Sequence, residues 1–449
     1  MRERVQMKST NHKLQTCKLT DYEKCVYGKQ TEQGEIVVWT KAFQTALDEN
    51  DYVYIPKGKY YVDDSIILSS NKWIKAHKKA EIILLQSCTK LMLRNADVID
   101  GSYTSIPKSA PRTENIRIEG GIWSESNRTR LGYGKTGKFD DEDSLHGVSC
   151  TMLFSGVNDL LLQNMTFAHS AGFCIQIGRC ENFTVKNIYC VNCYADGVHI
   201  NGEVKNGYVY NIHGEVGDDL VALNAYDWDN STINNGAIEN VTIEKIYAPI
   251  HSECYKAFRI QPGILPIENG EIDCYIKDVH IKNVKGVSVF KMYLQTPAYR
   301  EKPDGAKVGW MENMRFENVE VDAREPVDRF PNYLTGASIV GHFGAFELGS
   351  NIRSVSFKKV RVLLNKEKYP CSHFVTVGPK SQYIVETGIE LFDPYVVSAV
   401  EKLVCKNVRI NGKKVKDVQK EVCEISFPAD MYENQFGAGG SGKINEIIQ

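Results

Sequence analysis

The sequence predicts an all-β fold, a parallel β-solenoid whose N-terminal end is capped by a short helix. Two observations predict the solenoid: a short motif recurs along the chain, and apolar residues alternate with period two inside each copy. The interval from Asn182 to Asn206 is 24 residues, too short for a propeller blade. Helical periodicity of the ankyrin or tetratricopeptide kind is absent from the repeats.

Each copy of the motif starts with a polar turn pair, continues with alternating apolar residues and ends in another polar turn. The copies begin at Glu114, Asn158, Glu181, Lys205, Glu239, Lys277, Glu312 and Asn351. An antiparallel sandwich would need hairpin signals between consecutive strands, and the repeat spacing does not supply them. Intervals longer than 24 residues indicate loops inserted at one corner, where such a scaffold forms a binding cleft.

A different pattern precedes the repeats. Residues 38–48 have apolar side chains three and four apart, which predicts a short amphipathic helix, and strands are expected at Tyr52–Ile55 and Tyr60–Val62. A solenoid needs its open end covered, so the helix is predicted to be a cap. The expected organisation is an N-terminal region and cap (1–70), a catalytic solenoid (71–432) and a flexible, glycine-rich tail (433–449).

Composition excludes several classes of function. The net charge of −2 leaves no electrostatic footprint for nucleic acid or an anionic membrane, and no apolar run is long enough to span a bilayer. An apolar export segment is not found at the N-terminus, so we expect a cytoplasmic protein.

The 13 cysteines are an odd number in a long chain, which argues against a disulfide framework. Cys190 and Cys193 have the C-x-x-C spacing of some zinc sites, but they are interleaved with strand-like apolar residues. Buried, reduced thiols are therefore predicted, with no bound metal and no cofactor.

Carboxylates recur at equivalent places in two neighbouring coils. Asp196 and Asp219 are 23 residues apart, one coil, and Asp218 precedes the second of them. Stacked coils place such positions roughly 4.8 Å apart, so at least one of the three pKa values should be raised. A high-pKa acid beside an ionised base is what glycosidic bond cleavage requires. The alternative is that these residues are solvated turn aspartates.

Aligning the apolar positions of consecutive strands places polar side chains in outward columns. One column holds Gln176, His199, Ala222, Arg259 and Lys291, and its neighbour holds Asn201, Asn224, Gln261 and Tyr293. Cationic and hydrogen-bonding groups beside three carboxylates suit an anionic or polyhydroxylated substrate, although outward strand positions are often polar in any case. Tyr226 and Trp228 follow, either as a sugar-stacking platform or as aromatics packed under a loop.

The Asp-Gly motif at Asp196, the Asp-Asp pair at Asp218 and the dipeptide at Arg259 together resemble the polygalacturonases, glycoside hydrolase family 28. In pattern the resemblance covers roughly residues 35–365, and its specific motifs lie within 194–261. It implies a right-handed parallel β-helix and hydrolysis with inversion. It also implies that Asp218 is the general acid, that Asp196 and Asp219 position the attacking water, and that Arg259 holds the substrate.

The chain departs from the family's pattern in three places. Tyr194-Ala195-Asp196 stands where the family has Asn-Thr-Asp, and the family's Gly-His-Gly has no match, which leaves His199 as a candidate replacement. Arg-Ile-Lys becomes Arg259-Ile260-Gln261, which removes a charge from an expected uronate subsite.

We therefore expect a glycoside hydrolase that cleaves an α-glycosidic bond with inversion in a uronate-containing or pectin-derived oligosaccharide. Its partner is the oligosaccharide, with a homo-oligomer possible. A polysaccharide lyase or uronate epimerase on the same fold is the main alternative, since Arg259 and Lys291 could act as bases. A non-catalytic carbohydrate-binding solenoid is the third.

Overall fold

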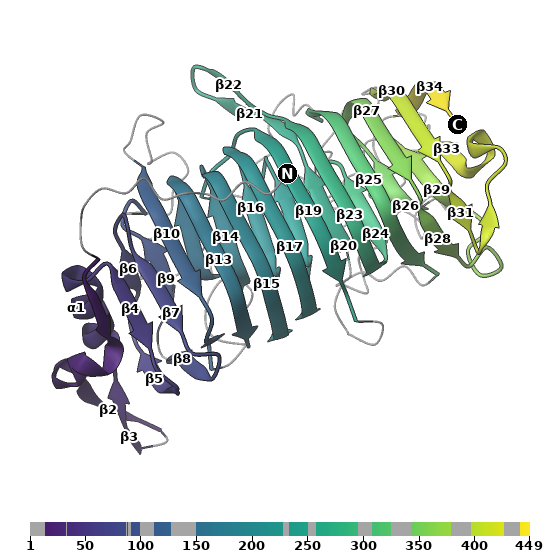
Figure 1. Ribbon diagram of the computed structural model, residues 1–449. Coiled ribbons are helices and arrows are strands. Elements are labelled where there is room, and N and C mark those ends of the chain that lie inside the picture. Colours follow the sequence, from purple (N-terminus) through teal and green to yellow (C-terminus); the bar gives the residue numbers. More distant parts are fainter. Residues whose placement is uncertain are drawn as a thin grey trace.

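The computed structural model is a right-handed parallel β-helix, as the sequence predicts (Figure 1). The structure describes residues 14–32, 34–86, 88, 91–98, 112–126, 150–227, 233–249, 257–294, 308–324, 343–378, 397–425 and 441–449. Within these residues, 21 strands form one long sheet, here sheet A, and 11 strands form a second, sheet B. No helix in this part of the chain has the length and apolar character needed to cross a membrane.

The eight sequence repeats are eight strands of sheet A. They are β10 (Thr113–Glu119), β13 (Val157–Ala168), β15 (Glu181–Cys193), β17 (Val204–Val216), β19 (Ile238–Tyr247), β23 (Ile276–Val287), β25 (Trp310–Ala323) and β27 (Asn351–Lys358). Each pairs in parallel with the next. Glu181 lies opposite Lys205, so the 24-residue period of the sequence is one turn of the solenoid.

Asparagines at the polar turns explain how these long strands bend. Asn164, Asn187 and Asn211 all have left-handed backbone conformations, with φ of 58°, 56° and 58°. Asparagine tolerates this conformation better than most side-chain-bearing residues. The amide Nδ2 of Asn187 donates to Asn164 Oδ1 at 2.8 Å, and that of Asn211 donates to Asn187 Oδ1 at 2.9 Å. The repeated asparagines thus form a hydrogen-bonded ladder along one corner.

Thirteen further strands of the described residues complete sheet A. They are β1 (Thr16–Lys18), β2 (Tyr27–Thr31), β3 (Gly34–Val38), β4 (Tyr52–Ile55), β5 (Gly58–Val62), β7 (Trp73–Ala76), β8 (Ala80–Leu84), β11 (Ile122–Ser124), β28 (Arg361–Leu364), β30 (Val397–Lys406), β31 (Arg409–Ile410), β32 (Lys413–Lys414) and β34 (Ser441–Ile448). β34 pairs in parallel with β30. The expectation of a flexible tail is therefore wrong for 441–448, while 433–440 lie outside the described residues. This strand was not predicted because the sequence before it is rich in glycine, which is typical of a flexible tail.

Sheet B carries the polar columns. Its strands are β6 (Ile66–Leu68), β9 (Leu93–Asn95), β12 (Cys150–Ser155), β14 (Phe173–Gly178), β16 (Val198–Asn201), β18 (Val221–Asn224), β20 (Ala257–Gln261), β24 (Val289–Met292), β26 (Phe343–Leu348), β29 (Ser372–Val377) and β33 (Val422–Glu424). Inward side chains stack between coils: the rings of Phe258 and Phe290 are 5.0 Å apart, and those of Phe290 and Phe346 are 4.9 Å apart. The antiparallel hairpin β21 (Gly263–Ile267) and β22 (Gly270–Cys274) follows β20.

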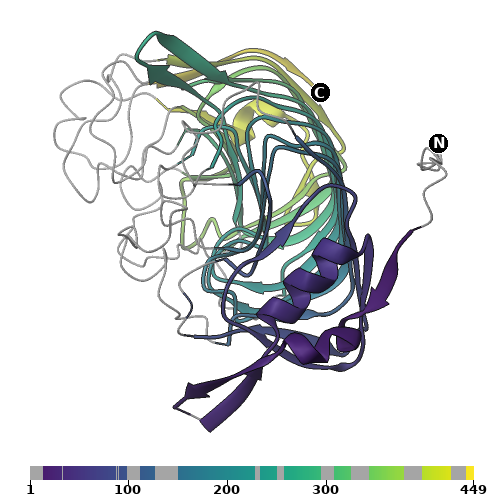
Figure 2. The same cartoon turned by 90° about the vertical axis from the view of Figure 1, so that its left-hand side faces the viewer.

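The N-terminal end is covered as expected. Helix α1 (Thr40–Glu49) lies across the open end of the solenoid when viewed along its axis (Figure 2), beside the 3₁₀ turn η1 (Leu19–Cys25). Its Phe43 and Leu47 side chains are buried in the core. β4 pairs with β7 and β5 with β8, so the first coil begins inside the region assigned to the cap. A second 3₁₀ turn, η2 (Val418–Glu421), precedes β33.

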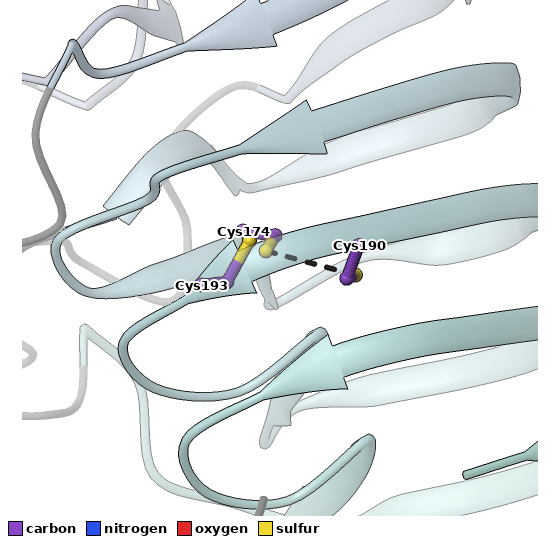
Figure 3. Close-up of side chains that lie close together, drawn as sticks. All are labelled: Cys174, Cys190 and Cys193. Atoms are coloured by element: carbon purple, nitrogen blue, oxygen red, sulfur yellow. Dashed lines mark hydrogen bonds between the residues drawn. The ribbon is translucent and has the colours of Figure 1, made fainter. Parts of the chain in front are cut away.

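Three cysteines lie together in the core (Figure 3). The sulfur atoms of Cys174, Cys190 and Cys193 are within 4.8 Å of one another, and all three side chains are buried. A structural zinc ion takes four ligands, and within the described residues this group supplies three. Burial raises the pKa of the Cys174 thiol, whereas hydrogen bonds from Cys174 and Cys190 lower the pKa of Cys193. Cys174, Cys180, Cys190 and Cys193 form no disulfide, and Cys254 lies outside the described residues.

Candidate active site

Three carboxylates meet just before β16 and β18. These strands pair in parallel, with Val198 opposite Val221, so the turns that precede them stack. Asp196, Asp218 and Asp219 each place a carboxylate oxygen within 4.8 Å of the others. The predicted gathering of the three carboxylates is confirmed.

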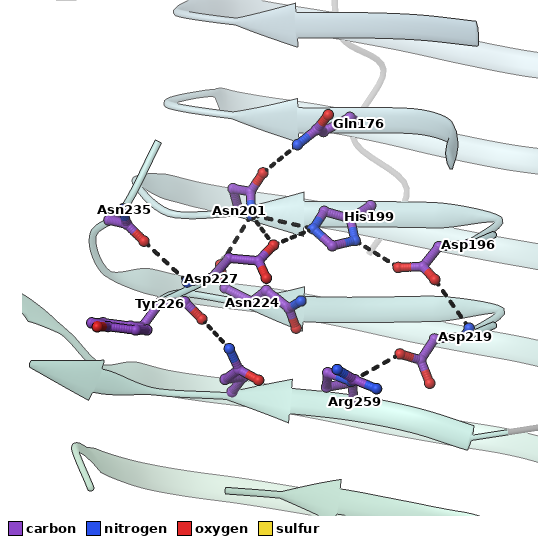
Figure 4. A network of polar contacts seen from close by, with 11 residues as sticks. Gln176, Asp196, His199, Asn201, Asp219, Asn224, Tyr226, Asp227, Asn235 and Arg259 are labelled. Carbon is purple, nitrogen blue, oxygen red and sulfur yellow. Dashed lines mark hydrogen bonds and ion pairs between the residues drawn. The ribbon is translucent and has the colours of Figure 1, made fainter. Parts of the chain in front are cut away.

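Asp196 links the two coils. Its Oδ1 accepts a hydrogen bond from the backbone N–H of Asp219 at 3.1 Å, and its Oδ2 lies 2.6 Å from His199 Nδ1 (Figure 4). The side chain is 4% exposed, so both contacts are shielded from water. Asp196 therefore fixes the turn that carries Asp219.

Arg259 supplies positive charge to the cluster. Its Nε lies 3.1 Å from Asp219 Oδ2, and its Nη2 lies 3.9 Å from Asp218 Oδ1. Its side chain is only 12% exposed. Arg259 projects from β20 as the sequence predicts, but it is a buried ion-pair partner, so its removal would also affect folding.

The surroundings of the cluster shift its protonation. Burial raises the pKa of Asp219 well above its usual range; Arg259 opposes this shift, and the charges of Asp218 and Asp196 add to it. Burial also raises the pKa of Asp196, against the hydrogen bond from His199. At least one pKa is raised, as expected, but it is raised at Asp196 and Asp219, the pair that was expected to stay ionised and position the water, and burial is the cause.

The first polar column has the predicted register. Pairing runs from Gln176 to His199, Ala222, Arg259 and Lys291 in consecutive strands. The column continues to Glu347 on β26, a residue that extending the alignment by one coil would have found. Gln176, His199, Ala222, Lys291 and Glu347 are buried and the Arg259 side chain is 12% exposed, which the strand pattern did not indicate.

The second column is mostly engaged within the protein. Gln176 Nε2 donates to Asn201 Oδ1 at 2.7 Å, and Gln261 Nε2 donates to the backbone oxygen of Tyr226 at 2.6 Å. Asn224 of this column and the nearby Asp219 are not fully engaged. Within the described residues, the buried oxygens Asn224 Oδ1 and Asp219 Oδ1 have no hydrogen-bond partner. These two oxygens are the best-placed acceptors for a bound water or sugar hydroxyl.

The two aromatic candidates have different outcomes. The Tyr226 side chain is 1% exposed and belongs to the hydrophobic core, which fits an aromatic packed under a loop and leaves no face for stacking a sugar. Trp228 lies outside the described residues.

Sequence reasoning missed Asp227 and Phe173. Asp227 Oδ2 lies 2.6 Å from His199 Nε2, on the opposite side of the ring from Asp196 (Figure 4). The Phe173 ring stacks on the imidazole, with centroids 3.9 Å apart and planes 12° apart. Asp227 follows β18 in the segment that provided Tyr226, but a residue beyond a strand has no place in a column alignment.

The carboxylates could together ligate a hard cation such as Ca²⁺, which prefers carboxylate oxygen. Arg259 Nε, 3.1 Å from Asp219, already provides positive charge at this place. The arrangement therefore suits acid–base chemistry without requiring a metal.

No protein-family model matches the sequence, and no curated protein matches it. Among solved structures, the chain is similar to a Yersinia enterocolitica family 28 exopolygalacturonase (13% identity, TM-score 0.48, 90% of this chain and 79% of that chain covered). It is also similar to the A-module of the Azotobacter vinelandii mannuronan C-5 epimerase AlgE4 (10%, 0.47, 88% and 91%). A third is the Streptococcus pneumoniae surface protein and adhesin PfbA (12%, 0.43, 97% and 100%).

Proposed function

We propose that the protein is a glycoside hydrolase that cleaves an α-glycosidic bond, with inversion, in a uronate-containing or pectin-derived oligosaccharide. The observation that carries the proposal is the buried cluster of Asp196, Asp218 and Asp219 against the Arg259 guanidinium. Like charges this close retain a proton, and a retained proton beside an ionised carboxylate supports acid–base cleavage of an acetal.

Accessibility separates the roles of the carboxylates. The Asp218 side chain is 22% exposed, whereas that of Asp219 is 2% exposed. Asp218 is therefore the carboxyl that can reach a glycosidic oxygen and protonate it.

Asp196 and Asp219 suit the positioning of a water molecule. Both oxygens of Asp196 accept hydrogen bonds, and Asp219 Oδ2 faces Arg259, which makes either carboxylate a poor nucleophile. Inverting enzymes usually separate their carboxyl groups by about 6.5–9.5 Å. Here the nearest oxygens lie within 4.8 Å, so the water would sit beside the cluster rather than between an acid and a base.

The charge of the column supports an anionic substrate. Lys291 follows Arg259 in register, and both lie beside the carboxylate cluster. Two cations on adjacent strands favour a sugar that carries a carboxylate. The lyase alternative is less well supported: Asp219 and Asp218 raise the pKa of Arg259 despite its burial, which opposes a role as a base.

The proposal is tested by incubating the full chain with oligogalacturonates and nitrophenyl glycosides. Wild type should release new reducing ends, and Asp218→Asn should lose about 10²–10⁴-fold in kcat. Asp322→Asn, which changes a partly exposed carboxylate of sheet A that pairs with Arg324, is the matched control. Equal turnover by wild type and Asp218→Asn would contradict the proposal, as would unsaturated products, which indicate a lyase.

A further inference from the structure

His199 lies between two carboxylates, and this geometry fixes how many protons the group holds. Its Nδ1 is 2.6 Å from Asp196 Oδ2 and its Nε2 is 2.6 Å from Asp227 Oδ2. A neutral imidazole has one N–H and one acceptor nitrogen, so two such contacts to carboxylates need a second proton. The arrangement that supplies it is an imidazolium between two carboxylates.

The environment of the ring agrees with this assignment. Burial lowers the pKa of His199, but Asp227 and Asp196 together raise it to about 10. Phe173 covers one face of the ring, and Asn201 Nδ2 donates to Asp227 Oδ2 at 3.0 Å. The ring, both carboxylates and the amide are all buried, so water does not compete for these contacts.

The same contacts connect a residue outside the carboxylate cluster to the cluster itself. Asn235 Oδ1 accepts the backbone N–H of Asp227 at 3.1 Å, Asp227 orients His199, and His199 holds Asp196. Asp196 in turn accepts the backbone N–H of Asp219. Each link is a hydrogen bond between buried groups, and Asn201 Nδ2 supports the middle of the chain through Asp227 Oδ2 at 3.0 Å and His199 Nε2 at 3.3 Å.

We propose that Asp227 is a positioning residue which, through the His199 ring, fixes the Asp196 carboxylate and thereby the turn that carries Asp219. This inference rests on the proposed function for its effect on catalysis. Asp227 would make no contact with substrate, and no covalent step passes through it. Outer partners of this kind typically change activity by about ten- to a hundredfold when removed.

The test compares Asp227→Asn with wild type. We expect kcat to fall about ten- to a hundredfold with a smaller change in KM. The acidic limb of the pH–rate profile should move to higher pH, because Asp196 loses its cationic neighbour while Asp218, Asp219 and Arg259 stay in place. Asn235→Ala, which removes only the acceptor for the Asp227 backbone, should shift the limb in the same direction by less.

Thr151→Val is the matched control. Thr151 is a buried hydroxyl on β12, hydrogen-bonded to Ser170 at 2.7 Å and outside the chain of contacts from Asn235 to Asp219. It should lower stability without moving the pH–rate profile. An Asp227→Asn profile with unchanged limbs would overturn the proposal.

A second readout does not depend on activity. NMR of ¹⁵N-histidine-labelled protein should show one imidazolium protonated at both nitrogens from pH 6 to 8, assigned by its loss in His199→Gln. In Asp227→Asn this ring should titrate at lower pH. If wild type cleaves no glycan, the proposed function fails while this signal still tests the link from Asp227 to His199. An ordinary titration near pH 6.5 in wild type would overturn that link.

Discussion

Sheets A and B belong to the same coils but treat their outward side chains in opposite ways. On sheet A, outward residues are exposed pairs such as Lys358 with Glu317 at 2.8 Å and Arg361 with Glu320 at 3.2 Å. On sheet B, the outward residues Gln176, His199 and Lys291 are polar or charged and buried, and the Arg259 side chain is 12% exposed. Exposed ion pairs contribute little to stability, whereas burying polar groups is costly unless each is hydrogen-bonded.

The difference indicates where function lies. Stability alone would favour apolar residues on the outward face of sheet B, as on the inward face of the same strands, which forms the hydrophobic core. A covered face that retains three aspartates, a histidine, an arginine and a lysine therefore points to chemistry. The exposed face of sheet A has the simpler task of keeping the coils soluble and in register.

Replacing one carboxylate on each face should give the largest difference in kcat between two variants. Asp219→Asn removes a buried member of the cluster, and kcat should fall about 10²–10⁴-fold. Glu317→Gln changes a partly exposed carboxylate of sheet A and should leave kcat unchanged. Steady-state kinetics on the same substrate measures both. A similar loss in the two variants would remove the distinction between the faces.

Removing one arginine from each face should affect both activity and stability. Arg259→Met should lower kcat/KM roughly a hundredfold. It should also destabilise the fold by about 3–5 kcal/mol, because Asp219 is left buried and unpaired. Arg361→Met breaks an exposed pair and should cost at most about 1 kcal/mol. Urea titrations and kinetics would test this, and equal unfolding midpoints would contradict the buried ion pair.

The two faces should also differ in how histidine couples stability to pH. The pKa of His199 is raised from 6.5 to about 10, so its contribution is complete below pH 6.5 and disappears as the pH rises through about 10. The pKa of His280 on sheet A is lowered by burial and by Lys282, so its effect is a loss of stability as the pH falls below 6.5.

Melting temperatures recorded against pH would separate the two histidines. His199→Gln should remove the alkaline part of the dependence, and His280→Gln should remove part of the acidic loss. An unchanged alkaline slope in His199→Gln would show that its ring is not held as a cation.

The smallest effect is expected at the asparagine ladder of sheet A. Asn187→Ala places alanine at φ 56° and removes both ladder hydrogen bonds, so stability should fall by about 1–2 kcal/mol without loss of activity. Asn187→Gly keeps the conformation accessible and should cost less. Thermal unfolding of both variants tests the assignment. Equal losses in the two would show that backbone strain plays no part.

Most of the fold could be predicted from the sequence because each coil of a solenoid has the same pattern of strands and turns as the coil before it. Once the Glu181 and Lys205 copies are aligned, their strand pairing follows at an offset of 24 residues, and an offset of 23 residues in the neighbouring sheet places Asp196 over Asp219. The columns also follow, since side chains two residues apart share a face. Glu347 was within reach of the same alignment.

The features that could not be predicted lie in segments that do not follow the repeat. Asp227 and Asn235 lie beyond β18, where no periodicity indicates a direction for their side chains. The burial of Gln176 and Arg259 could not be predicted either, since a strand pattern identifies an outward face without showing what covers it. The final strand, β34, was hidden because its glycine-rich approach is typical of a linker.

The stereochemistry of cleavage tests the central claim most directly. Proton NMR should be recorded during the first minutes of hydrolysis of an oligogalacturonate by wild type, before the product anomers equilibrate. If Asp196 and Asp219 direct a water molecule while Asp218 protonates the leaving oxygen, the first product has the inverted, β configuration. A first product that retains the α configuration would mean that one of these carboxylates attacks the sugar itself, and it would contradict the account.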